Sequence, residues 1–217
     1  MRLVDLVHHL FVSTFGGEDI DNLPEFMSDP TRKRADFLLF DGSVVVEMKE
    51  FVADRIEKIR KIIDFHRRLS DWPPMPDGTW LQDLLAAHPR GAEINAELRD
   101  ANTQSVEKTI RDANGQIRAT KVAVGREQAV GLLALVNERV DVLDPIVIAG
   151  TVHHLLRKRN PSGSLRYPSI DLVVIFTTAH FVVGVDGVTR LAILSMCRHD
   201  DPRGDELKAL AHRVMEA

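Results

Sequence analysis

The fold of this chain is decided by one stretch near its amino end, residues 34–49, which reads RADFLLFDGSVVVEMK. Two runs rich in apolar residues flank the dipeptide Asp41-Gly42. An Asp-Gly pair between two such runs predicts a β-hairpin, because its tight turn needs positive φ angles. With a two-residue turn, Leu39 pairs with Val44, and every other pair of the hairpin follows from that one.

The pairing places two carboxyl groups across from each other. Counted outward from the turn, Asp36 falls opposite Glu47 and Arg34 opposite Lys49. Side chains alternate between the two faces of a strand, so each face can be read from the sequence. One face is expected to be wholly apolar: Ala35, Phe37, Leu39, Val44, Val46 and Met48. The other face carries Arg34, Asp36, Glu47 and Lys49 at one end and Leu38, Phe40 and Val45 at the other.

The charged end of this hairpin needs a physical reason. Opposed carboxylates repel each other and destabilise a sheet, and a divalent cation between them would remove that cost. Lys49 points to the same side, where it could orient a water molecule or hold charge on a phosphate oxygen. The alternative is an exposed ladder of charges without function. A second Glu-x-Lys, Glu206-Leu207-Lys208, has no opposed acid and is set aside.

The rest of the chain predicts an α/β protein, with a mixed sheet of the α+β kind in one domain spanning residues 1–217. Apolar residues at helical spacing, and the caps and breaks around them, predict six helices. These helices are expected at residues 2–15, 51–68, 79–101, 104–124, 145–158 and 205–215. Short apolar runs predict further strands at residues 130–136, 170–177, 181–185 and 189–196. Residues 18–31 are expected to form a loop, and residues 51–101 a helical insertion.

Composition narrows the class of protein. The chain is 44% hydrophobic and 28% charged, as is usual for a globular domain, and its net charge is −4. An acidic chain does not coat nucleic acid through a global positive field, although a local basic groove remains open. Its single cysteine, Cys197, excludes an internal disulfide and fits a cytoplasmic protein. No apolar run approaches the ~20 residues of a membrane helix, and no signal peptide is expected.

The other motifs in the sequence give weaker indications of function than the hairpin does. Basic residues cluster at 32–34, 55–68 and 157–159, and each cluster taken alone is best explained as a solvated face. The pairs His8-His9 and His153-His154 are neighbours on expected helices and therefore cannot chelate a metal on one face. The chain has no phosphate-binding glycine loop, no Cys/His zinc pattern and no Gly-x-Ser-x-Gly elbow.

Arg34-Ala35-Asp36, the Asp-Gly turn and Glu47-Met48-Lys49 together resemble the PD-(D/E)XK nuclease superfamily. Its pattern is an Asp on one strand and an (Asp/Glu)-x-Lys on the next, followed by a helix that often carries Gln or Lys. Residues 104–124 look like that helix and residues 130–136 like the next strand. The resemblance covers about residues 1–136. It implies a restriction-endonuclease-like αβββαβ core, here with a helical insertion and a C-terminal extension of strands and a helix.

The resemblance also implies roles for individual residues. Asp36, Glu47 and the backbone carbonyl of Met48 would bind Mg²⁺ or Mn²⁺, Lys49 would activate or position water, and Gln116 would support the site. The family often adds an acid upstream; Glu25 is favoured here, with Asp5 and Glu18 as alternatives. This chain departs from the pattern in having Ala35 before Asp36, and in the long insertion after Lys49.

The expected activity is therefore hydrolysis of phosphodiester bonds in nucleic acid, with DNA favoured over RNA. Five basic residues are candidates for phosphate contacts: Arg34, Arg55, Lys58, Lys61 and Lys121. The second hypothesis is a non-catalytic module that keeps the fold and binds nucleic acid or a protein. The sequence leaves open whether the protein is a homodimer.

Overall fold

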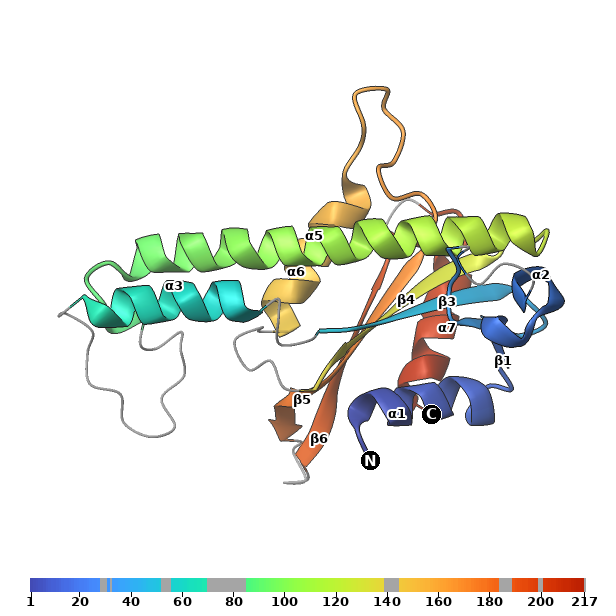
Figure 1. Cartoon of the computed structure of the whole chain (residues 1–217), viewed down its shortest axis with the longest axis horizontal. Helices are drawn as coiled ribbons and strands as arrows, with labels where there is room; N and C mark the ends of the chain where they lie inside the picture. Colours follow the sequence, from blue (N-terminus) through green and yellow to red (C-terminus); the bar gives the residue numbers. More distant parts are fainter. Residues whose placement is uncertain are drawn as a thin grey trace.

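The computed structural model describes residues 1–27, 31, 33–51, 56–69, 85–138, 145–183, 189–198 and 201–216. Within these residues, strands form one six-stranded sheet, and helices lie on both of its faces (Figure 1). The strands are β1 Glu18–Asp19, β2 Phe37–Leu39, β3 Val44–Glu50, β4 Val130–Asn137, β5 Leu172–Val183 and β6 Thr189–Cys197. The helices are α1 Leu3–His9, α2 Pro24–Met27, α3 Ile56–Arg68, α5 Gly91–Ala123, α6 Pro145–Arg157 and α7 Gly204–Glu216. The protein is thus an α/β protein with a mixed sheet, as expected.

The six strands lie in the sheet in the order in which they occur in the sequence. The pairs β1–β2, β2–β3 and β5–β6 are antiparallel, whereas β3–β4 and β4–β5 are parallel. The long connections between the parallel strands contain α5 and α6, as such crossovers require. Strand β4 is buried along its whole length, which explains why its sequence is apolar without alternation.

Different helices cover the two faces of the sheet. On one face, the apolar sides of α5 and α6 pack against inward-facing residues of β3, β4 and β5, such as Val45 and Leu133. On the other face, α1 and α7 pack against residues that include Phe37 and Val46. The hairpin of β2 and β3 therefore presents one face to α5 and the opposite face to α1. None of the described helices combines the length and the apolar character that crossing a membrane requires.

The most prominent difference from the sequence analysis is the helix α5. Residues 79–101 and 104–124 were expected to form two helices, but residues 91–123 form one helix of 33 residues. Buried residues continue on one side of this helix through the expected break, from Leu98 and Ala101 to Val106. Packing of this continuous stripe outweighs the low helix propensity of Asn102 and Thr103. The described part of residues 51–101 is mostly helical and contributes no strand, as expected.

Two further predictions from the sequence were wrong. The strands expected at residues 170–177 and 181–185 are one strand, β5, whose pairing with β6 shifts register between Thr177 and Phe181. A bulge of this kind lets a strand continue past an unpaired residue, which periodicity alone does not reveal. The segment expected to be a loop, residues 18–31, contains β1, a 3-10 turn at Ile20–Asn22 and α2. The first helix changes to a π-helix at Leu10–Thr14.

Candidate active site on the β2–β3 hairpin

The hairpin turn has the geometry that the Asp-Gly pair predicts. Asp41 and Gly42 have φ angles of 54° and 78°, and the Ser43 N–H donates to the Phe40 carbonyl at 3.1 Å. Leu39 pairs with Val44, which confirms the predicted register. Phe40 also has a positive φ of 52°, so it departs from the expected face and packs in the core on the α1 side.

Continued by one residue past the Phe37–Val46 pair, this register sets Asp36 across from Glu47, although Asp36 itself lies just before β2. The Asp36 N–H donates to the Val46 carbonyl at 2.9 Å, so the two segments are still in contact at this level. Ala35, one residue earlier, was expected on the Phe37 face. It lies instead in the core on the α5 side, because the regular strand begins only at Phe37 and the alternation of faces does not extend back to Ala35.

Glu47 is completely buried on the face of the sheet that α5 covers. Lys49 Nζ forms an ion pair with Glu47 Oε1, and the Lys49 side chain keeps 26% of its surface exposed. Among the described residues, no group forms a hydrogen bond of good geometry with either Glu47 oxygen. Burial and the nearby charge of Asp36 raise the pKa of Glu47 to about 8, while Lys49 and the Gln116 amide act in the opposite direction.

Asp36 is held by the strand that it faces. Its Oδ2 accepts a hydrogen bond from the Met48 N–H at 2.6 Å. Burial raises the pKa of the Asp36 carboxyl, whereas this hydrogen bond and the charge of Lys49 lower it. The negative charges of Asp19 and Asp21 add to the rise in pKa. The two opposed carboxyl groups therefore both have raised pKa values, mainly because each is partly or wholly removed from water.

Helix α5 fixes the chain immediately before Asp36. Gln116 Nε2 donates to the Arg34 carbonyl at 2.8 Å, and the Ala35 N–H donates to Thr120 Oγ1 at 2.8 Å. The two α5 side chains are four residues apart and therefore lie on the same side of the helix. Gln116 thus reaches the segment that leads into the hairpin, and its amide lies close enough to influence the pKa of Glu47.

Two acids beside Asp36, Asp19 and Asp21, were not among the candidate residues predicted from the sequence. Asp19 pairs with Phe37 across β1 and β2, and Asp21 forms an ion pair with Arg34. The Ile20 N–H donates to the Asp36 carbonyl at 3.0 Å, which ties this segment to the hairpin. The three acids around the single apolar residue Ile20 in Glu18-Asp19-Ile20-Asp21 were the available signal, since charged side chains are common on a short edge strand.

Glu25, Glu18 and Asp5 were the candidates for a further acid of the site, and each has other neighbours. Glu25 and Glu18 line a groove of about 360 Å³ beside the hairpin turn, together with Asp41 and Arg126. Asp5 pairs with Arg2 at the start of α1. Among the upstream acids, Asp19 and Asp21 are the ones whose charges raise the pKa of Asp36.

The basic residues expected to contact nucleic acid occupy different environments. Lys61 is exposed on α3 and pairs with Glu57 at 2.7 Å. Arg34 is paired with Asp21, next to the site. Arg55 and the side chain of Lys58 lie outside the described residues.

Lys121 does not suit a role in binding nucleic acid, because it is buried and its pKa is lowered by burial. Its Nζ lies 3.3 Å from Oδ2 of Asp171, at the start of β5. Asp171 Oδ1 lies 3.1 Å from the guanidinium groups of both Arg198 and Arg203. The Gly131 N–H donates to Asp171 Oδ2 at 2.7 Å. Lys121 is therefore part of a buried charge cluster that joins α5, β4, β5 and the segment leading into α7.

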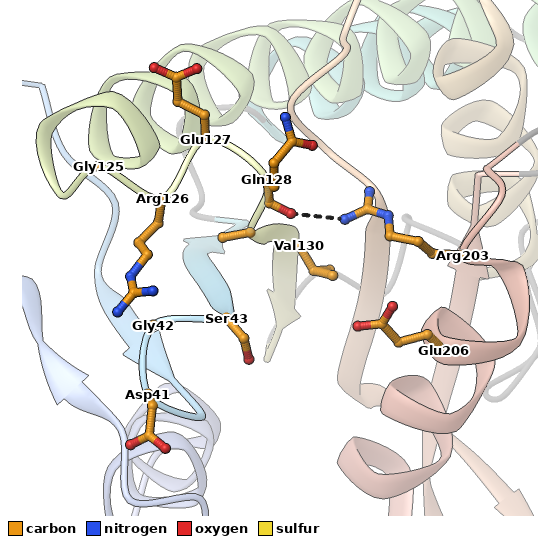
Figure 2. Close-up of a pocket in the computed structure, with 11 residues that line it drawn as sticks. Asp41, Gly42, Ser43, Gly125, Arg126, Glu127, Gln128, Val130, Arg203 and Glu206 are labelled. Atoms are coloured by element: carbon orange, nitrogen blue, oxygen red, sulfur yellow. Dashed lines mark hydrogen bonds between the residues drawn. The ribbon is translucent and has the colours of Figure 1, made fainter.

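A groove beside the hairpin turn is lined by residues other than Glu47. It has a volume of about 610 Å³ and lies beside the hairpin turn, where β3 and β4 begin. Figure 2 shows Arg203 on one side, donating to the Gln128 carbonyl at 3.2 Å, and the Asp41 turn on the other. The charged residues that line it are of both signs: Asp41, Arg126, Glu127, Arg203 and Glu206.

The oxygen atoms around Asp36 and Glu47 can be compared with the ligands that a divalent cation requires. Among the described residues, no group of three or more His, Cys, Asp or Glu side chains is arranged to hold a metal ion. Asp36 and Glu47 provide two carboxylates, and the Met48 carbonyl would be the third oxygen donor. Lys49 pairs with Glu47 Oε1, but no described residue forms a hydrogen bond of good geometry with either buried Glu47 oxygen, so lone pairs remain for a cation. This oxygen donor set fits Mg²⁺, which usually keeps several water ligands.

The chain matches no known protein family, no curated protein and no solved structure. The resemblance to PD-(D/E)XK nucleases therefore depends on the few residues of the hairpin and on the order of the elements around it.

Proposed function

We propose that this protein is a metal-dependent phosphodiesterase, a nuclease, whose active site is formed by Asp36, Glu47, Lys49 and Gln116. The observation that carries the proposal is Glu47: a wholly buried carboxyl, across from a second acid, with no well-formed hydrogen bond from the described residues to its oxygens. Burying a charge in this way is costly unless a counter-charge compensates it. Lys49 supplies one positive charge to a site that holds two carboxyl groups.

The chemistry follows from the positions of these groups. Asp36, Glu47 and the Met48 carbonyl would hold Mg²⁺ or Mn²⁺, which when bound would polarise a phosphate and lower the pKa of a water molecule. Lys49, partly exposed beside Glu47, orients the attacking water and stabilises negative charge on the phosphate. Gln116 holds the chain at Arg34 and thereby positions Asp36.

The order of elements supports a restriction-endonuclease-like core in this proposal. Helix α1 precedes strands β2 and β3, and α5 leads into β4, which lies parallel to β3. The elements from β5 to α7 would extend that core. The second candidate is a module that binds nucleic acid without cutting it. The absence of a third side-chain ligand among the described residues favours this alternative.

The proposal is tested by incubating the protein with mixed DNA and RNA in Mg²⁺ or Mn²⁺, with EDTA as the blank. We expect cleavage that needs the metal, and we expect Lys49→Ala to reduce the rate by ~10²–10³ because one charge-stabilising group is lost. The matched control is Lys208→Ala, which alters the other Glu-x-Lys of the chain, on the exposed face of α7, and should cut like the wild type. Equal cleavage by Lys49→Ala and the wild type would remove Lys49 from the site.

A further inference from the structure

We infer that the outer face of α5 and the loop after α6 form one surface that binds the phosphate backbone of duplex nucleic acid. The inference rests on the proposed function, because it states that the nucleic acid bound by the proposed nuclease is a duplex. The surface is called the basic strip. It comprises Lys108, Arg111 and Arg118 on α5, Arg157 at the end of α6, and the loop residues Lys158, Arg159 and Arg166.

The α5 part of the basic strip lies on one side of the helix. Lys108, Arg111 and Arg118 are exposed, and their spacing of three and seven residues places them on the same face. They extend over ~15 Å of the helix axis, at ~1.5 Å per residue. That length of duplex carries roughly nine phosphate charges. The described structure forms no ion pair with any of these three side chains, unlike Lys61 on α3.

The loop part projects beyond α5. Figure 1 shows the orange loop after α6 rising above α5, away from the sheet. From residue 157 to residue 168 it contains four basic residues and no acidic one. Its tip is closed by hydrogen bonds, from the Asn160 N–H to the Ser164 carbonyl and from the Gly163 N–H to the Asn160 carbonyl, each at 2.8 Å. The tip residues between 160 and 164 are small and exposed, so a nucleic-acid backbone can approach closely.

Contacts at its base hold the loop against α5. Glu107 Oε1 accepts a hydrogen bond from the Tyr167 hydroxyl at 2.9 Å and pairs with Lys158 at 3.2 Å and Arg166 at 3.3 Å. The Ser169 N–H donates to Asn114 Oδ1 at 2.9 Å. Glu107 is therefore already used within the strip, and the loop lies against α5, so the exposed basic residues of both elements share one surface, which also carries the exposed Asp112.

The lack of aromatic side chains indicates a duplex rather than a single strand. Proteins that bind single strands without sequence preference stack the bases on exposed aromatic rings. The exposed residues of α5 from 104 to 122 and of the loop from 157 to 169 include no aromatic one; Tyr167 is buried, with the Arg166 guanidinium 5.7 Å from its ring. Arginine and lysine alone suit the phosphate backbone of a duplex, whose bases are stacked inside.

The strip also lies close to the proposed active site. Gln116, which reaches the hairpin, is on the same helix between Arg111 and Arg118. A duplex lying across the outer face of α5 would therefore pass near the edge of α5 at which Gln116 and Arg34 meet. The strip would bind and orient the substrate, and the reacting groups would remain those of the hairpin.

The test measures binding separately from cleavage. Fluorescence anisotropy is recorded for a short labelled duplex DNA, the same duplex as RNA, and one single strand, in EDTA and again in Ca²⁺. Arg111→Ala/Arg118→Ala should weaken duplex binding and reduce the slope of log K against log salt by roughly 1.8, about 0.9 for each lost phosphate contact. The matched control is Arg2→Ala/Lys208→Ala, which removes two positive charges from α7 and the start of α1, on the other face of the sheet. It should leave the slope unchanged.

The outcomes separate this inference from the proposed function. Weaker duplex binding by the strip variant, with no cleavage by the wild type, would support the strip and reject the nuclease. Cleavage by a wild type whose binding and salt slope do not change in the strip variant would overturn the strip and leave the nuclease standing. Binding of the single strand in preference to both duplexes, or no binding of any duplex, would also overturn the inference. Comparison of the two duplexes decides between DNA and RNA.

Discussion

At the residue scale, Asp36 and Glu47 are opposed carboxyl groups, and this arrangement costs stability when no cation is bound. Asp36→Asn removes the charge that Asp36 places beside Glu47, while an amide oxygen can still accept the hydrogen bond from the Met48 N–H. We expect this variant to lose cleavage and to have an unchanged or raised melting temperature in EDTA. Thermal unfolding and a cleavage assay on the same preparation measure both effects.

The same substitution elsewhere in the hairpin serves as a control. Asp41→Asn alters the exposed turn, where Asn tolerates the positive φ, and should retain cleavage. A clear fall in the melting temperature of Asp36→Asn, with cleavage retained, would indicate a structural charge ladder instead of an active site.

Glu47 gives the protein a specific dependence on pH. Its pKa is about 8 in the folded state, above the usual value of 4.5. Between these values the folded state binds more protons than the unfolded state, so the free energy of unfolding falls as pH rises. We expect the apo protein to be less stable at about pH 8 than at about pH 5, and Glu47→Gln to reduce this difference. Added Mg²⁺ should stabilise the wild type more at the higher pH, because it competes with the proton.

Thermal unfolding in EDTA across this pH range measures the effect, and Glu206→Gln is the control because Glu206 is exposed on α7. An identical pH dependence in the wild type and Glu47→Gln would mean that Glu47 does not titrate as its burial requires.

At the element scale, β4 approaches the segment before β5 through Gly131. A Cβ at this position would lie 1.8 Å from the Ser169 carbonyl oxygen and 2.9 Å from Ile117 Cγ2. The backbone must therefore move, and the hydrogen bond from the Gly131 N–H to Asp171 would be disturbed. We expect Gly131→Ala to lower the free energy of unfolding by ~1–3 kcal/mol, the usual cost of overpacking. Urea unfolding provides the measurement.

Gly150 provides the matched comparison, since it lies on α6 with no atom within 4 Å of an added Cβ. Gly150→Ala should stabilise the protein by ~0.5–1 kcal/mol through helix propensity. Equal stability of the two alanine variants would contradict the close approach of Gly131 to the Ser169 carbonyl oxygen.

At the scale of the whole molecule, the buried charge cluster around Asp171 holds several elements together. This single carboxylate pairs with Lys121, Arg198 and Arg203, which come from α5 and from the segment between β6 and α7. Asp171→Asn would leave buried positive charges without their partner. We expect a loss of ~3–5 kcal/mol in the free energy of unfolding, as for other buried pairs that lose one member.

Denaturant unfolding of Asp171→Asn measures this loss. Asp205→Asn, at a fully exposed position on α7, should unfold like the wild type. A stability of Asp171→Asn equal to that of Asp205→Asn would contradict the role of the cluster in joining the elements.

The sequence by itself determined the local structure of the site. The Asp41-Gly42 turn sets the register of the hairpin from Leu39–Val44 to Phe37–Val46, and this register, continued by one residue, predicts Asp36 opposite Glu47. Strand β4 and helix α6 were also predicted, because short-range periodicity and capping signals decide them. Each of these features depends on residues within a few positions of one another.

Only the tertiary structure decided how that hairpin is surrounded. The burial of Glu47, and hence its raised pKa, depends on α5, which begins some forty residues later. The ion pair of Lys121 with Asp171 joins residues fifty positions apart, and it turns an expected surface lysine into a buried one. Packing also merged two expected helices into α5, because one buried stripe is worth more than the weak propensity of a few residues. Sequence patterns carry information about neighbours along the chain, whereas solvation and charge pairing depend on which distant segments the fold brings together.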